Sequence, residues 1–359
     1  MGLTNIDDFK SIVLENRPLL DVRSPIEFVE GAFLGATNLP LLSDEERRLI
    51  GIRYKEAGNS KAVKLGEELV GPYKDERVSK WMAYIKENPD AYLYCFRGGQ
   101  RSKISQEWIL DAGVNIPRLK GGYKAFRTYL MQKAEEVSQQ LDTFIIGGRT
   151  GSGKTLVLKE FENIIDLEGL ANHRGSAFGK QLEEQPSQID FENSLSYKLI
   201  QHDNKKPLIL EHESKNVGRL YIPTKIYENL MHGKLIVLET PIQQRVDITY
   251  DEYVLKAISK YENLYKEEGM ARWFEDANNA LDKIQKRLGS KRYLYLKNIF
   301  KDAYQCDDIE ANKVWIQYLL EDYYDKMYDY QIEKTSIPIV FRGNFDEVRA
   351  YLNSIEIIV

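Results

Sequence analysis

One cysteine of this sequence stands where a nucleophile could be activated. Cys95 ends the apolar run Y-L-Y-C and is followed by F-R-G-G-Q-R-S and then by a helical pattern. In such a strand–loop–helix, backbone N–H groups and the positive end of the helix converge on the thiol and favour the thiolate. Two arginines add positive charge, and two glycines allow the tight turns that a loop around an anion needs. We therefore predict a nucleophilic Cys95 and an anion-binding loop made of Arg97, Gly98, Gly99, Gln100 and Arg101.

A second motif has the spacing of a phosphate-binding loop. The run G-R-T-G-S-G-K-T begins at Gly148, after the strand-like F-I-I-G and before the helical pattern L-V-L-K-E-F. The backbone N–H groups and the lysine of such a loop cradle a di- or triphosphate, but the motif does not distinguish a nucleotide from another diphosphate. Thr155 and Glu211 are the candidate ligands if Mg²⁺ accompanies the phosphate, and no metal is required by the sequence. The predicted phosphate-binding residues are Gly148, Gly151, Ser152, Gly153, Lys154 and Thr155.

The elements that position these two motifs are predicted to form two α/β domains. Short apolar runs alternate with amphipathic stretches, a pattern that indicates parallel sheets covered by helices on both faces. A polar, helix-prone stretch at 131–141 is predicted to link residues 1–130 to a second domain at 142–359. Within the second domain, residues 253–334 are predicted to be mostly helical. The predicted strands lie at 18–22, 92–95, 117–122, 144–148, 207–211, 235–239 and 337–341.

Composition and charge are those of an ordinary globular protein. Charged residues make up 29% of the 359 residues and apolar residues 43%, and no run approaches the ~20 apolar residues that a membrane span needs. The N-terminus has no signal-peptide pattern, so a cytoplasmic location is expected. The net charge of −5 does not indicate a nucleic-acid partner, yet basic residues cluster at 47–55 and 283–297. Such runs are commonly solvated helix faces, although tyrosines within the second run would suit base stacking.

The cysteine loop resembles the active-site loop of the rhodanese family of group-transfer enzymes. Two further segments agree with this family, namely D-V-R-S-P-I-E-F at 21–28 and L-K-G-G-Y-K-A-F at 119–126. Their order implies a rhodanese-like parallel-sheet domain at 1–130. Dual-specificity phosphatases of the same superfamily also place an arginine six residues after the cysteine, as Arg101 follows Cys95. Their chemistry needs an acidic proton donor, which this loop does not contain.

A rhodanese-like domain followed by a phosphate-loop domain is similar to the tRNA 2-selenouridine synthase family. The run D-L-E-G-L-A-N-H-R-G-S-A-F-G at 166–179 resembles a hallmark of that family, and the segments at 59–70, 211–223 and 239–246 are also similar to it. The resemblance covers essentially the full chain. It implies a P-loop NTPase-like α/β domain at 142–359, whose helical region at about 253–334 would bind tRNA.

The resemblance implies a transferase that replaces sulfur by selenium in the wobble 2-thiouridine of tRNA. Its co-substrates would be selenophosphate and geranyl diphosphate, because the exchange would pass through an S-geranyl intermediate. Cys95 would carry selenium as a perselenide or activate it, and the phosphate loop would hold the diphosphate. A selenophosphate-producing enzyme is an implied partner, and a membrane is not. The residues expected to contact tRNA or the diphosphate are His173, Arg174, Arg219, Lys283, Lys286, Arg287, Lys291 and Arg292.

Two other functions fit the same motifs. The first is a rhodanese-type sulfurtransferase fused to a nucleotide-binding module and acting on another acceptor. The second is a nucleotide-gated module that binds tRNA or protein and whose rhodanese fold has lost its activity. The retention of Cys95 in an anion-binding loop argues against the second function. The acceptor molecule separates the first function from selenouridine synthesis.

Overall fold

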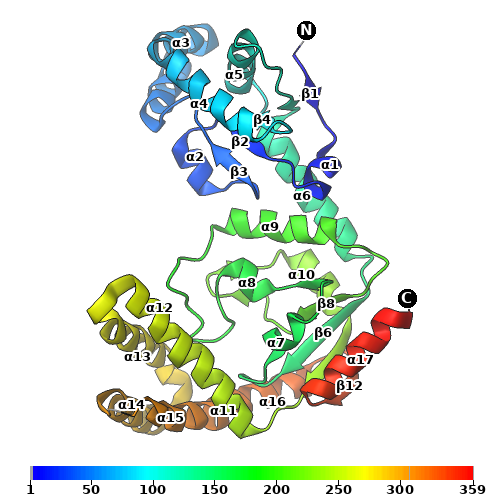
Figure 1. The fold of residues 1–359 in the computed structure, drawn as a ribbon, viewed down its shortest axis with the longest axis vertical. Helices are drawn as coiled ribbons and strands as arrows, with labels where there is room; N and C mark the ends of the chain where they lie inside the picture. The colour runs from blue at the N-terminus through cyan, green and yellow to red at the C-terminus, as the bar shows by residue number, and fades with distance from the viewer. Residues whose placement is uncertain (1–2, 307, 359) are drawn as a thin grey trace. The chain divides into compact units, whose positions relative to one another are not determined.

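The computed structural model describes residues 3–306 and 308–358 and divides into two compact units, each built on its own sheet (Figure 1). The N-terminal unit contains the chain up to Val137 together with Pro186–Gln201. The C-terminal unit contains Ser138–Gln185 and the chain from His202 onward. The predicted fold class is confirmed, because both main sheets are parallel and are packed against helices.

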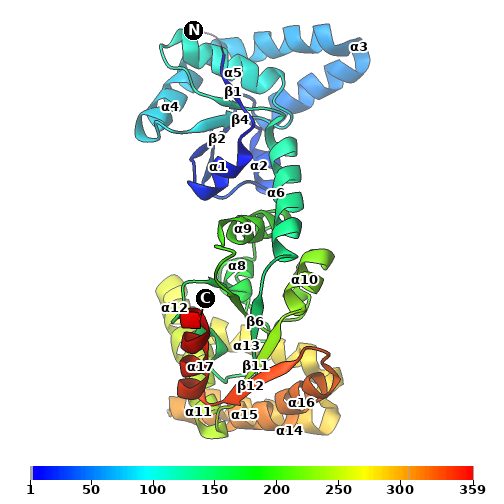
Figure 2. The same cartoon turned by 90° about the vertical axis from the view of Figure 1, so that its right-hand side faces the viewer.

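The N-terminal unit holds a five-stranded parallel sheet in the order β1-β5-β4-β2-β3. Its strand β2 is buried along its whole length, as expected for a strand with helices on both faces. The elements are β1 Asn5–Ile6, α1 Phe9–Leu14, β2 Leu19–Asp21, α2 Pro25–Glu30, β3 Ala36–Asn38, α3 Asp44–Val70, α4 Lys74–Glu87, β4 Tyr92–Tyr94, α5 Gln100–Asp111, β5 Arg118–Leu119, α6 Gly122–Ser138 and α9 Gln188–Gln201. Figure 2 shows α3 as two helical arms, which meet at Gly58, where φ is 78°.

Helix α9 packs in the N-terminal unit, although it follows the phosphate loop in the chain. The prediction that residues 142–359 form one domain therefore differs from the structure at this helix. The reason is its contacts: Asp190 accepts a hydrogen bond of 2.7 Å from the backbone N–H of Ala32, and Asn193 accepts one of 2.8 Å from Arg127. Tyr197 and Ile200 of α9 are buried in the core of this unit.

The C-terminal unit holds a second five-stranded parallel sheet, in the order β12-β11-β6-β8-β7, and a small antiparallel pair. Every residue of β6 and β8 is buried, which explains why both strands are almost unbroken apolar runs. The elements around the sheets are β6 Thr143–Gly148, α7 Lys154–Leu158, β7 Ile164–Ile165, α8 Leu167–Ala171, β8 Leu208–Glu211, β9 Asn216–Val217, β10 Leu220–Tyr221, α10 Thr224–Met231, β11 Lys234–Leu238, β12 Ile339–Gly343 and α17 Phe345–Ile358.

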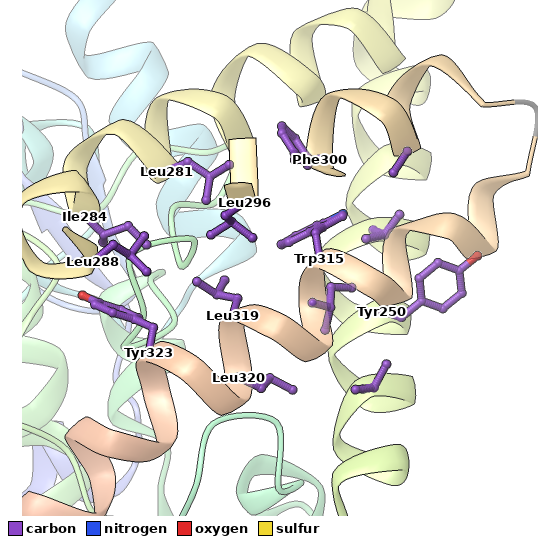
Figure 3. Packing of buried hydrophobic residues seen from close by; sticks show 14 of the residues in the cluster. Tyr250, Leu281, Ile284, Leu288, Leu296, Phe300, Trp315, Leu319, Leu320 and Tyr323 are labelled. Carbon is purple, nitrogen blue, oxygen red and sulfur yellow. The ribbon is translucent and has the colours of Figure 1, made fainter. Parts of the chain in front are cut away.

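A helical lobe lies between β11 and β12 in the chain and has its own apolar core. Trp315, Leu319 and Phe300 lie at its centre, between helices that Figure 3 shows around them. The predicted helical region is thus confirmed, and two π-helical turns, Asp251–Leu255 and Leu320–Tyr324, interrupt it. The helices are α11 Ile242–Tyr250, α12 Lys256–Tyr265, α13 Gly269–Leu288, α14 Ser290–Gln305, α15 Asn312–Leu319 and α16 Asp325–Lys334. Over the described residues, no helix combines the length and apolar character that crossing a membrane requires.

Candidate active sites

Cys95 lies between the end of β4 and the start of α5, as the sequence predicted. Its side chain is 3% exposed, and its Sγ lies 3.1 Å from the hydroxyl of Ser102, to which it donates. The Ser102 hydroxyl in turn donates to the Gly99 carbonyl at 3.2 Å. If Cys95 loses its proton, the same hydroxyl can turn and donate to the thiolate, beside the positive end of α5. Sequence reasoning did not identify Ser102 as a partner of Cys95.

The loop after Cys95 is shaped by close contact with the turn at 120–123. Gly98 has a φ of 63°, and a Cβ there would lie 2.9 Å from the backbone nitrogen of Gly121. Gly122 has a φ of 59°, and a Cβ there would overlap the carbonyl oxygen of Cys95. The N–H of Tyr123 donates to that same carbonyl at 2.9 Å. These two glycines are therefore required by the approach of two backbone segments, and the second rhodanese-like segment serves to fix the loop.

Arg101 is paired with Glu27, a partner that the sequence did not reveal. The two guanidinium nitrogens lie 2.5 and 3.0 Å from the Glu27 oxygens, and Arg47 approaches the same carboxylate at 3.2 Å. Burial would raise the pKa of Glu27, but hydrogen bonds and charge from Arg101, with help from Ser24 and Arg47, lower it to about 2. The charge of Arg101 is thus largely offset, whereas Arg97 is exposed and stacks over Phe96 at 5.7 Å.

The phosphate loop has the predicted strand–loop–helix form, between β6 and α7. Gly151 and Gly153 have φ values of 77° and 89°, which only glycine adopts readily. Lys154 extends back along the loop and donates to the Gly148 carbonyl at 3.1 Å. A pocket of about 580 Å³ opens over the loop and is lined by residues of Gly148 to Thr155. The structure therefore brings together the six residues predicted to bind phosphate.

Three glutamates meet beside this loop, and one oxygen of each lies within 4.8 Å of the others. They are Glu168 from α8, Glu211 from the end of β8 and Glu213 just after it. Burial, with the charge of Glu168, raises the pKa of both Glu211 and Glu213 above the ordinary carboxyl value, although Lys154 opposes the rise. Glu211 is 1% exposed, and its Oε1 has no hydrogen-bond partner among the described residues. Clustered carboxylates with an unpartnered buried oxygen suit a divalent cation, so the residues present fit Mg²⁺.

The segment at 166–179 supplies the far wall of the same pocket. Asp166 caps α8 by accepting a hydrogen bond of 2.7 Å from the N–H of Gly169, and this cap directs Glu168 toward the other two glutamates. His173 lines the pocket, its Nδ1 is buried without a hydrogen-bond partner in the described structure, and burial lowers its pKa. Arg174 also lines the pocket and is held by an ion pair with Glu252.

Comparison with known proteins matches both units. The model of the tRNA 2-selenouridine synthase AAA domain matches residues 141–357, and the rhodanese-like domain model matches residues 5–129. The chain belongs to the tRNA 2-selenouridine synthase family.

Three curated tRNA 2-selenouridine synthases show how completely the chain matches this family. The protein from Sulfurovum sp. (strain NBC37-1) is 53% identical over 357 residues, which cover 98% of each chain. The protein from Hydrogenovibrio crunogenus is 45% identical, over 97% of this chain and 98% of its own. The protein from Pseudomonas fluorescens is 40% identical, over 96% of this chain and 97% of its own. Matches of this extent include both the rhodanese-like unit and the phosphate-loop unit.

The residues that the synthase resemblance assigned to tRNA or diphosphate do not form one cluster. His173, Arg174 and Arg287 line the phosphate-loop pocket. Lys283 lines a neighbouring pocket. Arg219 lines neither pocket and is instead held by Gln185, whose backbone carbonyl accepts from its guanidinium. The remaining three residues, Lys286, Lys291 and Arg292, are exposed on α13 and α14.

The neighbouring pocket was not anticipated from the sequence. It has a volume of about 420 Å³ and shares Arg174, Gln181, Glu252 and Tyr253 with the phosphate-loop pocket. Its lining includes charged side chains, among them Lys180, Lys260, Asp276 and Lys283. It also includes aromatic and alanine side chains from the segment 177–178, α12, α13 and α15, namely Ala177, Phe178, Ala257, Tyr261, Trp273, Ala277, Ala280 and Trp315. In this synthase-family chain, a site for phosphoryl groups therefore continues into a pocket whose walls combine apolar and charged side chains.

Proposed function

We propose that this protein replaces the sulfur of wobble 2-thiouridine in tRNA by selenium, in two steps that use geranyl diphosphate and then selenophosphate. The activity in the names of its full-length relatives supports the overall reaction. The observation that carries the two-step scheme is the pocket that joins a phosphate loop to apolar walls, in a chain that also holds a buried cysteine in an anion-binding loop.

The first step is S-geranylation. The thiocarbonyl sulfur of the base attacks C1 of the geranyl group, the C–O bond to the diphosphate breaks, and S-geranyl-2-thiouridine and diphosphate result. Lys154 and the loop amides are placed to stabilise the charge on the leaving diphosphate. A chain of ten carbons fits the neighbouring pocket, whose half-buried Phe178, Tyr261 and Ala277 would shield it from water.

A divalent cation is compatible with this step. Glu168, Glu211, Glu213 and Thr155 would hold it, and it would supply positive charge beside the diphosphate. The phosphate loop can hold the diphosphate with or without this cation, because Lys154 lines the same pocket.

The second step is selenation, in which Cys95 removes the phosphoryl group from selenium. A perselenide holds selenium two electrons more oxidised than selenophosphate does, so carriage as a perselenide would need an oxidant. Transfer of the phosphoryl group from selenium to Cys95 needs no oxidant. The selenium of selenophosphate attacks C2 of the base, the C2–S bond breaks, and geranylthiol leaves. The Cys95 thiolate then attacks phosphorus and breaks the P–Se bond, which leaves 2-selenouridine, and water releases phosphate from the cysteine.

The loop around Cys95 suits this phosphoryl transfer. Its amides and Arg97 are available to an anion, while Ser102 can donate to the thiolate. The spacing of Cys95 and Arg101, which is also found in phosphatases of this superfamily, is consistent with a loop that holds phosphate. The tRNA would meet both sites in the cytoplasm, with selenophosphate supplied by the enzyme that produces it.

The test is nucleoside mass spectrometry of 2-thiouridine tRNA incubated with the purified protein. Geranyl diphosphate alone should give S-geranyl-2-thiouridine, and addition of selenophosphate should convert it to 2-selenouridine. Formation of 2-selenouridine without geranyl diphosphate would contradict the two-step scheme. A requirement for ATP in the same assay would instead favour a nucleotide in the phosphate loop.

A further inference from the structure

The first turn of helix α3, called its root below, is held to the N-terminal unit by hydrogen bonds and an ion pair. Ser43 and Glu46 form a reciprocal cap at its start, with hydrogen bonds of 2.7 and 3.2 Å. Asp44 accepts a hydrogen bond of 2.9 Å from the backbone N–H of Ile26, and Arg77 is paired with Glu46 at 2.8 Å. The direction in which the arms of α3 leave the unit is therefore fixed by α2 and α4.

Residues 51–60, where the two arms meet, contribute nothing to a core. All residues from 51 to 60 are exposed, and Tyr54 is 57% exposed. The two arms approach each other close to the root, where a Cβ at Gly66 would lie 3.4 Å from Ile50. Because ten successive exposed residues gain little from burial, the folding of this unit does not explain why the arms project so far.

The end of the arms carries positive charge without partners. Between residues 51 and 66 there are four basic residues and one acidic residue, Glu56. The structure gives none of the four basic residues an ion pair within the described residues, whereas Arg47 and Arg48 near the root are both paired. The four are Arg53, Lys55, Lys61 and Lys64. Unpaired cations on an exposed arm are complementary to a polyanion.

One face of the first arm also forms a wall beside the Cys95 loop. Five of its residues share this face because they are three or four positions apart, and the groove between them and the loop has a volume of about 800 Å³. Across the groove lie Phe96, Arg97 and Arg101. The five residues of the wall are Arg47, Ile50, Gly51, Tyr54 and Lys55.

We propose that this groove and the basic arms bind a single-stranded segment of RNA and place one of its bases next to the Cys95 loop. This inference rests on the proposed function, which supplies RNA as the substrate. Tyr54 stacks on a base, and the four unpaired basic residues contact the phosphates on either side. An exposed aromatic ring among free cations is the arrangement that unpaired nucleotides require, whereas a small anion such as selenophosphate has no use for the arm.

The experiment is fluorescence anisotropy of a labelled anticodon stem-loop with the full-length protein at several salt concentrations. The double variant Arg53→Glu with Lys55→Glu should bind at least tenfold more weakly, and the slope of log affinity against log salt should fall by roughly 0.7 for each phosphate that the arm no longer neutralises. Tyr54→Ala should weaken binding about tenfold with an unchanged salt slope, because stacking involves no counterion release.

Matched variants separate the groove from general effects of charge and folding. Gly51→Glu places bulk and negative charge in the groove, at a position where an added Cβ meets nothing within 4 Å, and should weaken binding. Gly51→Ala keeps the groove open and should bind as the wild type does. Lys10→Glu, which reverses an exposed charge on α1 of the same unit, should also leave binding unchanged.

The inference is overturned if RNA binding is unchanged both in Arg53→Glu with Lys55→Glu and in Tyr54→Ala. That result would instead favour an acidic protein as the partner of the arms. This outcome is distinct from failure of the proposed function. If the wild type forms 2-selenouridine but these variants bind RNA normally, only the inference fails. If the wild type forms no modified base but the variants lose RNA binding, only the proposed reaction fails.

Discussion

The carboxylate of Glu27 holds the guanidinium of Arg101 through hydrogen bonds of 2.5 and 3.0 Å, although 74 residues separate them in the chain. Glu27 also accepts from the backbone N–H of Ser24 at 3.1 Å and so caps its own helix. The pair thus ties α2 to the first turn of α5. Arg101 acts by positioning the loop, and Arg97 is left as its exposed cation.

The Glu27–Arg101 pair should make the stability of the N-terminal unit depend on pH. The folded-state pKa of Glu27 is lowered to about 2 from 4.5, so its contribution is complete above about pH 4.5 and is lost as pH falls toward 2. The shift corresponds to at most about 3 kcal/mol of unfolding free energy. Glu27→Gln should remove this dependence, as measured by hydrogen exchange of β4 and α5 amides between pH 6 and 3.

A surface variant provides the control for this measurement. Glu45 is paired with Arg48 in an exposed position, so Glu45→Gln should leave the exchange rates and their pH dependence close to those of the wild type. Equal pH dependence in Glu27→Gln and the wild type would show that the pair does not stabilise the loop.

Removal of the Ser102 hydroxyl should slow selenation and leave geranylation unchanged. A thiolate at Cys95 would lose one hydrogen-bond donor, which is worth about 1 kcal/mol and corresponds to a roughly fivefold lower rate. Ser105→Ala is the matched control, because Ser105 is a buried serine of the same helix that donates to the Arg101 carbonyl instead. Single-turnover selenation of S-geranyl tRNA measures the effect, and an equal loss in both variants would contradict a specific role for Ser102.

A bulky side chain in the apolar pocket should obstruct the prenyl chain. Ala277→Trp is expected to raise the KM for geranyl diphosphate about tenfold, since filling the pocket removes apolar burial of the chain. Inhibition by inorganic diphosphate should not change, because the phosphate loop is untouched. Ala271→Trp, at an exposed position of the same helix, should have normal kinetics. Weaker inhibition by diphosphate in Ala277→Trp would indicate a general distortion instead.

Removal of one carboxylate from the cluster of three glutamates should change the thermal stability of the protein. Glu211→Gln removes a buried carboxylate whose pKa is raised by burial and by Glu168, so it should increase the Tm of the protein in the absence of divalent ions. Mg²⁺ should raise the Tm of the wild type by mass action and have a smaller effect on this variant. The same Mg²⁺ response in both proteins would exclude Glu211 as a ligand.

The two loops were predictable because each is a contiguous motif. Cys95 and Lys154 are surrounded by the residues that shape their loops, so the chain order itself reveals them. Glu27 and Glu168 were missed as site residues because their partners are distant in sequence, and a lone glutamate carries no signal of such a partner. Helix α9 belongs to the N-terminal unit because of its contacts with Arg127 and Ala32, and no local sequence pattern indicates these contacts.

The pockets and the role of α3 also depend on contacts between residues that are distant in the sequence. Apolar side chains of the helical region were predicted only as helix-forming residues, and the fold alone decides which of them line the pocket beside Arg174. The basic run at 47–55 could not be told from a solvated face until its exposure and its place beside Phe96 and Arg97 were known.

The central claim, that the two sites perform separate steps, is tested most directly by nucleoside mass spectrometry of two variants. With 2-thiouridine tRNA and both co-substrates, Cys95→Ser should still geranylate the base but form no 2-selenouridine, and the base that carries selenophosphate at C2 should accumulate. Lys154→Ala should lose geranylation by at least a hundredfold but still convert pre-geranylated tRNA to 2-selenouridine. Loss of geranylation in Cys95→Ser, together with full activity of Lys154→Ala, would contradict the account.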